Sequence, residues 1–290
     1  MNFARYAVTA RRAGTGAGLT TLAMMCAVVL LLAFSGTAEA ATAAGLGTAD
    51  SFAVLGGSTV TNTGPSVISG NLGVSPGSAV TGFPPGTVTN GTIHAADAVA
   101  DQAQRDTTTA YDDLAGQPCD TNLTDQDLGG LTLTSGVNCF KKSAQLTGTL
   151  TLNAQGDPNA VFIFQIGSTL TTASGSRVNL INGAQACRVF WQIGSSATLG
   201  TTTAFVGNVL AYTSITANTS ATVQGRLLAQ NGAVTLDSNT ITRATCGSGG
   251  TTGGLTTGSA TTGLTTGGET TGETTGGVTT GATTGGMTTG

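Results

Sequence analysis

Two short segments of the chain return at regular intervals, and this repetition limits the fold more than any other feature. Residues 162–167, FIFQIG, return 27 residues later as VFWQIG at 189–194, and residues 207–211, GNVLA, return 18 residues later as GRLLA at 225–229. A unit this small cannot bury its own apolar face, so successive units must stack on one another. The repeats predict a parallel β-solenoid, with a β-sandwich as the alternative, because hairpins also give short strands.

Threonine alternates with branched apolar residues in many short segments. Five apolar residues each lie between two threonines: Val60, Val88, Leu133, Leu150 and Ile241. A period of two is typical of a half-buried strand, with the apolar side chain inward and threonine outward. Glycine, asparagine, serine and proline separate these segments and predict turns.

One segment departs from this alternation. Between residues 94 and 115, the apolar residues follow a spacing that places them on one side of a helix: Ala96, Val99, Ala103, Ala110 and Leu114. Gly116 and Pro118 then end the helix. The fold class expected is therefore all-β with one long helix that packs alongside the solenoid.

Charged side chains are scarce, and this excludes several functions. The 290 residues hold 10 Lys and Arg and 14 Asp and Glu, or 8% charged, with a net charge of -4. A typical soluble domain has about 25% charged residues. Too few basic residues are present to neutralise a run of phosphates, so nucleic-acid binding is excluded. Threonine, rather than a charged residue, is the main polar residue of the chain.

The two ends of the chain differ in composition from the middle. Residues 1–40 are typical of an export signal, with three arginines, an apolar run over 22–34 and the cleavage site Ala38-Glu39-Ala40. Residues 249–290 contain 18 Thr and 15 Gly among 42 residues, which predicts a disordered linker or stalk. The folded domain is expected at 41–248. We expect a secreted, monomeric protein, free or held at the cell surface, with no stable membrane insertion after cleavage.

Four cysteines follow the predicted signal: Cys119, Cys139, Cys187 and Cys246. An even number in an exported chain favours two disulfides, and four cysteines allow three pairings. Pairing of the neighbours in sequence, Cys119 with Cys139 and Cys187 with Cys246, is preferred. A zinc site would need CxxC spacing or histidine partners, which the sequence lacks, so no metal or other cofactor is expected.

Hydroxyl residues fall into columns when the repeats are aligned. The pairs share equivalent positions in four successive coils: Thr171 and Ser174, Thr198 and Thr201, Thr216 and Thr219, and Thr235 and Ser238. Two residues three apart cannot face the same way on a straight strand, so each pair must span a strand end. Stacked coils would repeat each column at about 4.8 Å. The expected surface is a flat, nearly uncharged array of hydroxyls and methyls.

With these segments identified, residues 46–246 resemble the single-domain ice-binding protein family, also called DUF3494. Five segments carry the resemblance: 70–77 (GNLGVSPG), 128–133 (LGGLTL), 160–167 (AVFIFQIG), 189–194 (VFWQIG) and 225–229 (GRLLA). The resemblance implies a discontinuous right-handed β-solenoid of triangular cross-section, with a helix along its axis. It further implies secretion and binding to ice crystals through one flat solenoid face.

The family's ice-binding motif, Thr-Ala/Gly-x-Thr/Asn, can be compared with this chain position by position. Residues 216–219, TANT, match it fully, and the resemblance therefore adds Ala217 to the candidate ice-binding residues. Residues 198–201 depart from the motif at Leu199, and residues 171–174 and 235–238 depart at two positions each. The second of these segments contains a charged residue, Asp237.

Catalytic functions fit the sequence less well. The G-x-S-x-G motif at 73–77 fails as a nucleophile elbow because Pro76 lacks the N–H that an oxyanion hole needs. Asp112-Asp113 and Asp125-x-Asp127 could serve a glycosidase or a calcium site, but they are expected on a helix and in a loop. We therefore expect no catalytic residues and no small-molecule substrate. An extracellular adhesive or structural module is the alternative function.

Overall fold

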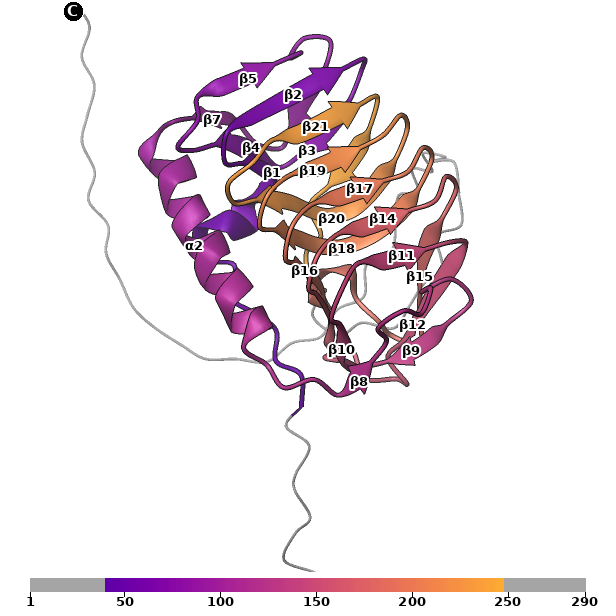
Figure 1. The fold of residues 1–290 in the computed structure, drawn as a ribbon. Helices are drawn as coiled ribbons and strands as arrows, with labels where there is room; N and C mark the ends of the chain where they lie inside the picture. The colour runs from indigo at the N-terminus through magenta and orange to yellow at the C-terminus, as the bar shows by residue number, and fades with distance from the viewer. Residues whose placement is uncertain (1–39, 248–290) are drawn as a thin grey trace, which may run out of the picture. The chain divides into compact units, whose positions relative to one another are not determined.

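The computed structural model describes residues 40–247, which wind into a solenoid of short parallel strands with one long helix beside it (Figure 1). Each coil contributes strands to three faces, and every strand pairs in parallel with the equivalent strand of the next coil. The predicted parallel β-solenoid is confirmed. The predicted signal at 1–40 lies outside the described residues except for Ala40, and the predicted tail lies outside them entirely.

The first face is a seven-stranded sheet, which we call the flat face. Its strands, in spatial order, are β11 (Ala144–Leu146), β14 (Leu170–Thr172), β17 (Ala197–Leu199), β19 (Ile215–Ala217), β21 (Val234–Asp237), β2 (Thr59–Thr63) and β5 (Ala79–Thr81).

The other two faces belong to a 15-stranded sheet that bends around the solenoid. The helix face holds β8 (Thr121–Asn122), β10 (Gly136–Phe140), β13 (Phe162–Ile166), β16 (Val189–Ile193), the second halves of β18 (Ala204–Ala211) and β20 (Thr222–Ala229), β1 (Phe52–Gly56), β4 (Asn71–Val74) and β7 (Ile93–Ala95). The third face holds β9 (Thr132–Thr134), β12 (Thr149–Asn153), β15 (Arg177–Ile181), the first halves of β18 and β20, β22 (Thr240–Thr242), β3 (Val67–Ser69) and β6 (Thr87–Thr89).

β18 and β20 turn the corner between these two faces at glycines. Gly207 has a φ of 116°, and a Cβ there would lie 2.7 Å from the indole nitrogen of Trp191. A Cβ on Gly225 would lie 1.9 Å from the carbonyl oxygen of Gly207 in the adjacent coil. Only glycine allows the two strands to bend at the same place while the coils stay in contact.

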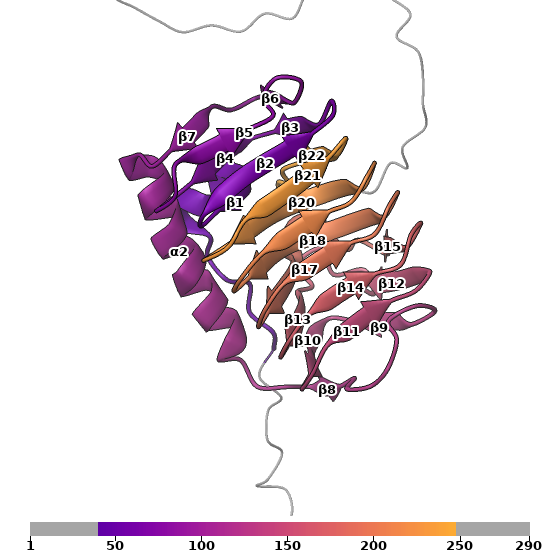
Figure 2. The ribbon, with the colours of Figure 1, turned by 45° about the horizontal axis from the view of Figure 1, so that its top comes forward.

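The order of the coils in space differs from their order in sequence. The first coils, β1 to β7, stack on the last one, because β1 pairs with β20, β2 with β21, and β3 with β22. After β7 the chain crosses to the opposite end of the stack through helix α2 and resumes at β8 (Figure 2). The solenoid is therefore discontinuous in sequence, as the family resemblance implies.

Helix α2 (Ala98–Ala115) lies along the helix face and packs on β1, β4, β7, β13 and β16 (Figure 1). The helix begins at Ala98 rather than at residue 94, because Asp97 caps it with a hydrogen bond from the Ala100 N–H at 2.8 Å. Ala96 therefore lies before the helix, and Val99 is 41% exposed. The prediction that these two residues belong to the buried side of the helix is wrong. The buried side is lined by Ala100, Ala103, Gln104, Thr107, Ala110 and Leu114.

Two apolar cores hold these layers together. The solenoid interior contains Phe164 stacked on Trp191 with ring centroids 3.9 Å apart, and Trp191 is fully buried. A second core, between the helix face and helix α2, includes Leu114, Ile163 and Phe190. The aromatic residues of the repeats are thus core residues. Both preferred disulfides are present, Cys119–Cys139 and Cys187–Cys246.

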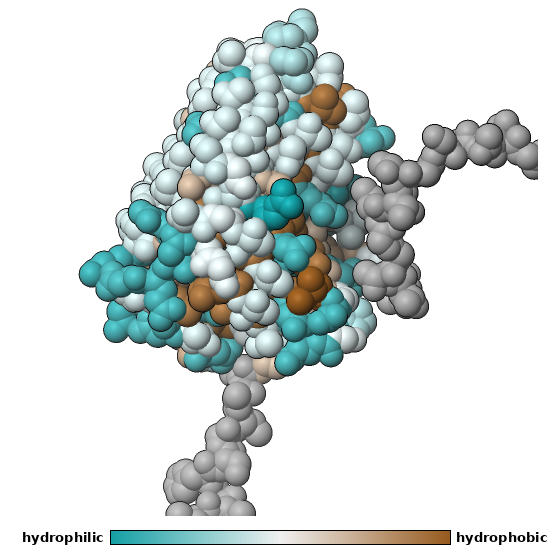
Figure 3. Space-filling view, turned by 90° about the vertical axis from the view of Figure 1, so that its right-hand side faces the viewer, coloured by the Kyte–Doolittle hydropathy of each residue, from teal (hydrophilic) through white to brown (hydrophobic). Residues whose placement is uncertain are grey.

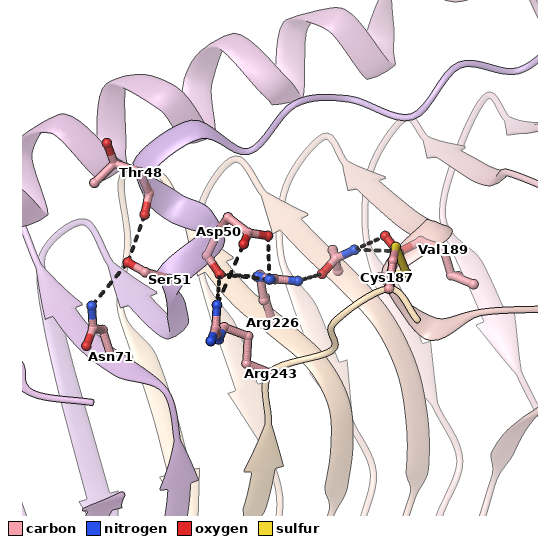
Figure 4. A network of polar contacts seen from close by, with 10 residues as sticks. Thr48, Asp50, Ser51, Asn71, Cys187, Val189, Arg226 and Arg243 are labelled. Atoms are coloured by element: carbon pink, nitrogen blue, oxygen red, sulfur yellow. Dashed lines mark hydrogen bonds and ion pairs between the residues drawn. A yellow bond between two sulfur atoms is a disulfide. The ribbon is translucent and has the colours of Figure 1, made fainter. Parts of the chain in front are cut away.

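The short helix η1 (Gly47–Ser51) ties the start of the domain to its last coils (Figure 4). The Arg226 side chain is 2% exposed and donates to the Asp50 carboxylate at 2.6 Å and to the Asp50 carbonyl at 2.7 Å. It also donates to Asn208 at 2.8 Å, while Arg243 donates to the same carbonyl at 3.1 Å. Burial lowers the pKa of Arg226 to about 10, so the guanidinium is charged at neutral pH.

Candidate functional site

A column of threonines runs across the middle of the flat face. We call it the central column. Parallel pairing in register places side by side Gln145 on the edge strand β11 and then six threonines: Thr171, Thr198, Thr216, Thr235, Thr61 and Thr81. The threonines of the strand interiors alternate with inward-facing residues, as Thr198 does with the buried Ala197 and Leu199, and Thr81 ends its strand before Gly82. Six neighbouring strands thus present one threonine each at the same height.

Thr61 and Thr81 extend the central column beyond the four coils predicted from the repeats. They belong to β2 and β5, which the discontinuous order of the coils places beside β21. The hydroxyl of Thr61 lies 3.4 Å from that of Thr235, although 174 residues separate them in sequence. The alternation at 59–61 predicted a strand there, but not which coil it would join.

Ala217 is not part of this surface, which corrects its assignment as an ice-binding residue. It is 1% exposed and its side chain points into the solenoid core. The reason is the alternation of the strand: Thr216 faces outward, so the next residue must face inward. The small residue of the motif contributes to packing beneath the surface.

A second column lies at the end of the flat-face strands. Ser174, Thr201 and Thr219 each lie two residues beyond the end of a flat-face strand. Each directly precedes a residue with positive φ: Gly175 (71°), Thr202 (56°) and Ser220 (62°). The backbone N–H of each of these three donates to the second-column residue of the next coil: Gly175 to Thr201, Thr202 to Thr219, and Ser220 to Asp237. The three hydroxyl residues are exposed.

Ser238 does not hold the fourth place in the second column, which corrects its prediction. The connection from the central column to the third face is one residue shorter in this coil, since Thr216 and Thr222 of one coil pair with Thr235 and Thr240 of the next. Ser238 itself has the positive φ, 53°, and its N–H donates to Thr63. The second column is therefore Ser174, Thr201, Thr219, Asp237 and Thr63.

Asp237 is the only charged residue in these two columns. One of its carboxylate oxygens accepts from the Thr219 hydroxyl at 2.5 Å and the other from the Ser238 hydroxyl at 3.0 Å. No ion pair among residues 40–247 includes this carboxylate. The central column itself carries no charge. The flat face is therefore an array of hydroxyls whose one charge in the two columns, the Asp237 carboxylate, lies at the strand ends.

The third face is less regular than the flat face, although it also carries threonines. Its outward positions include the exposed Arg177 and Asn179, with the apolar Ala204 beside Arg177. Figure 3 views the molecule from the side where β9, β12 and β15 lie, and shows hydrophilic residues gathered on the lower part with apolar ones between them. A column as uniform as the central one is therefore a property of the flat face.

The carboxylates considered for catalysis lie apart from the flat-face columns. Asp112 and Asp113 are exposed on helix α2, and Asp125 is exposed in a loop beside Lys142 at 3.5 Å. Asp127 accepts the backbone N–H groups of Gly129 and Thr147, which lower its pKa although its partial burial acts in the opposite direction. Within residues 40–247, no group of three metal-ligating side chains converges, and no helix is long and apolar enough to cross a membrane.

Known proteins share both the sequence and this architecture. Residues 54–242 match the family described as "Ice-binding-like". An ice-binding protein of Nostoc sp. (strain HG1) is 60% identical over 223 residues, which cover 77% of this chain and 82% of the relative.

Two solved structures show the same likeness. An ice binding protein from an Antarctic biological consortium is 49% identical with a TM-score of 0.69, covering 71% of this chain and 94% of that one. The ice-binding protein of the Antarctic ascomycete Antarctomyces psychrotrophicus is 42% identical with a TM-score of 0.67, covering 69% and 98%. With a family match over most of the folded domain, a 60% identical relative and a shared architecture, this chain belongs to the ice-binding-like family.

Proposed function

We propose that this protein is a secreted ice-binding protein that adsorbs to ice through the flat face and thereby slows ice growth and recrystallisation. The observation that carries the proposal is the central column, in which six neighbouring strands each present one threonine in register. The names of its relatives, which are ice-binding proteins, support the same function.

The chemistry of the central column suits a solid water surface. Ice offers neither charge nor a pocket, so binding must come from many weak contacts on a flat, regularly spaced array. Each threonine hydroxyl can hydrogen-bond to an ordered water, and the adjacent methyl limits competing hydration. The β-branch restricts χ1, so little side-chain entropy is lost on contact. Strands about 4.8 Å apart supply the regular spacing.

The remaining features of the proposal follow from the domain and the sequence. We propose that residues 1–40 are removed on export, that residues 249–290 form a linker or stalk, and that the domain acts as a monomer without catalysis or a cofactor. Two disulfides support an extracellular location, because such bonds persist in oxidising compartments.

A pair of bulky replacements on the flat face tests this function. Thr198 and Thr216 are neighbours in the central column, and changing both to Tyr would lift the surface away from a flat ice plane. Thr222 and Thr240 are neighbours on the third face, so Thr222→Tyr with Thr240→Tyr is the matched control.

Ice recrystallisation is followed by microscopy with the purified full chain. We expect the wild type and the control pair to inhibit grain growth at micromolar concentration, and the flat-face pair to lose inhibition with an unchanged melting temperature. Grain growth unaffected by the wild type would refute the proposal. Equal loss in both pairs would refute the flat face as the site.

A further inference from the structure

We propose that Asp237 limits how strongly the flat face holds ice, and that a hydroxyl residue at this position would strengthen binding. This inference rests on the proposed function and concerns the same surface. Asp237 lies in the second column between Thr219 and Thr63, where the coils on either side present a hydroxyl. It is thus one carboxylate within a row of hydroxyls.

The carboxylate takes up hydroxyl donors that would otherwise face the ligand. Thr219 donates its only hydroxyl proton to Asp237, and Ser238 donates to the other oxygen. A hydroxyl has one proton to donate, so neither residue can donate to ice while these bonds last. Hydrogen bonds to a charged acceptor are also about twice as strong as neutral ones, which favours the internal bond over one to ice.

The charge of Asp237 adds a second penalty. Its carboxylate is half-buried and no cation among the described residues pairs with it, so water supplies the rest of its solvation. Contact with a flat ice plane would strip or reorganise that water, and removing solvent from an unpaired charge is costly. Asp237 therefore weakens ice binding at β21, the strand that pairs with β19 on one side and with β2 on the other.

The turn at Asp237 is held by hydrogen bonds that do not use its carboxylate. The Asp237 N–H donates to the side-chain oxygen of Asn239 at 2.7 Å. The side-chain amide of Asn239 in turn donates to the carbonyl oxygens of Asn218 and Ala221 at 2.9 and 3.1 Å. These bonds hold the shortened turn through the backbone. Threonine at this position should therefore be accommodated, as it is at Thr219 and Thr63 on the adjoining coils.

The test compares Asp237→Thr with the wild type in the full-length protein. We expect the lowest concentration that inhibits recrystallisation to fall by about threefold, the effect of one additional weak hydrogen bond to ice. Asp237→Asn removes the charge but retains an acceptor, so its improvement should be smaller. Asp113→Asn, on the exposed side of helix α2, changes the net charge equally and should have no effect. Circular dichroism melting verifies that each variant is folded.

A double-mutant cycle with Thr219→Val identifies the mechanism. In the wild type, Thr219→Val should weaken inhibition less than it does in the Asp237→Thr background, because the Thr219 proton is already donated to Asp237 and only its acceptor oxygen and its side-chain shape are available to ice. In the Asp237→Thr background, the same replacement should remove part of the improvement. The inference is overturned if folded Asp237→Thr inhibits recrystallisation no better than the wild type. If the Thr198 and Thr216 tyrosine pair still abolishes inhibition in that case, the proposed function stands. An inactive wild type together with an inactive Asp237→Thr would refute both.

Discussion

Threonine on the flat face illustrates how one residue type serves two requirements at once. Its branched side chain suits a strand, and its hydroxyl and methyl together suit an uncharged ordered surface. Threonine at an outward strand position is common in any β protein. The central column is distinctive because the residues on six successive strands are the same and are in register.

The stabilisation that Asp97 gives helix α2 as its N-terminal cap depends on pH. Hydrogen bonds from the Ala100 N–H and the His94 ring lower the pKa of Asp97 from 3.8. A carboxyl whose pKa is depressed in the folded state stabilises the fold above its unfolded pKa and loses this contribution as pH falls through the folded value.

We therefore predict that Asp97→Ala lowers the melting temperature at pH 6, and that the difference from the wild type shrinks as pH falls below about 4. Thermal unfolding followed by circular dichroism at several pH values measures this. Asp101→Ala serves as the control on the first turn of the same helix. A difference that stays constant down to pH 2 would contradict the ionised cap.

Among the elements, helix α2 depends on small buried residues. Ala100, Ala103 and Ala110 are fully buried against the solenoid, so the helix approaches the sheet closely. We predict that Ala103→Leu destabilises the fold by about 2 kcal/mol through overpacking. Ala98→Leu, at an exposed position of the same helix, should leave stability unchanged. Chemical denaturation measures both variants, and equal stability of Ala103→Leu and the wild type would contradict this packing.

Local patterns of the sequence predicted the elements better than their arrangement. The alternation at Val60, Leu150 and Ile241 predicted strands, and all three residues are buried in strands. The start of helix α2 was misplaced because β7 precedes it and the cap at Asp97 outweighs the apolar spacing. Ser238 was misplaced because the repeat alignment assumed turns of equal length.

The site could be predicted only where consecutive repeats build it. Thr171 to Thr235 lie on coils that follow one another in sequence, so their column was visible in the repeats. Thr61 and Thr81 join it through a contact between the two ends of the domain, which no local pattern encodes. Replacement of Thr61 by Tyr should therefore weaken recrystallisation inhibition as much as replacement of Thr235. A Thr61→Tyr variant with full activity would confine the site to the predicted coils.

At the scale of the whole domain, closure between its first and last coils depends on Arg226. Its removal would leave the side-chain oxygen of the buried Asn208 without its donor, and would leave the Asp50 carbonyl with Arg243 alone. We predict that Arg226→Met lowers the free energy of unfolding by about 2 kcal/mol, the usual cost of unpaired buried polar groups. Arg105→Met, which removes only exposed contacts with Asp101 and Gln102, should leave stability unchanged. Denaturant titration distinguishes the two, and equal effects would contradict the role of Arg226.

Direct adsorption to a single ice crystal tests the central claim that the flat face is the surface that holds ice. Fluorescently labelled wild type, the Thr198 and Thr216 tyrosine pair, and the Thr222 and Thr240 tyrosine pair are each exposed to a crystal, and the bound fluorescence is measured after exchange of the solution. We predict that the wild type and the third-face pair stay on the crystal while the flat-face pair washes away. Retention of the flat-face pair at the wild-type level would contradict the account.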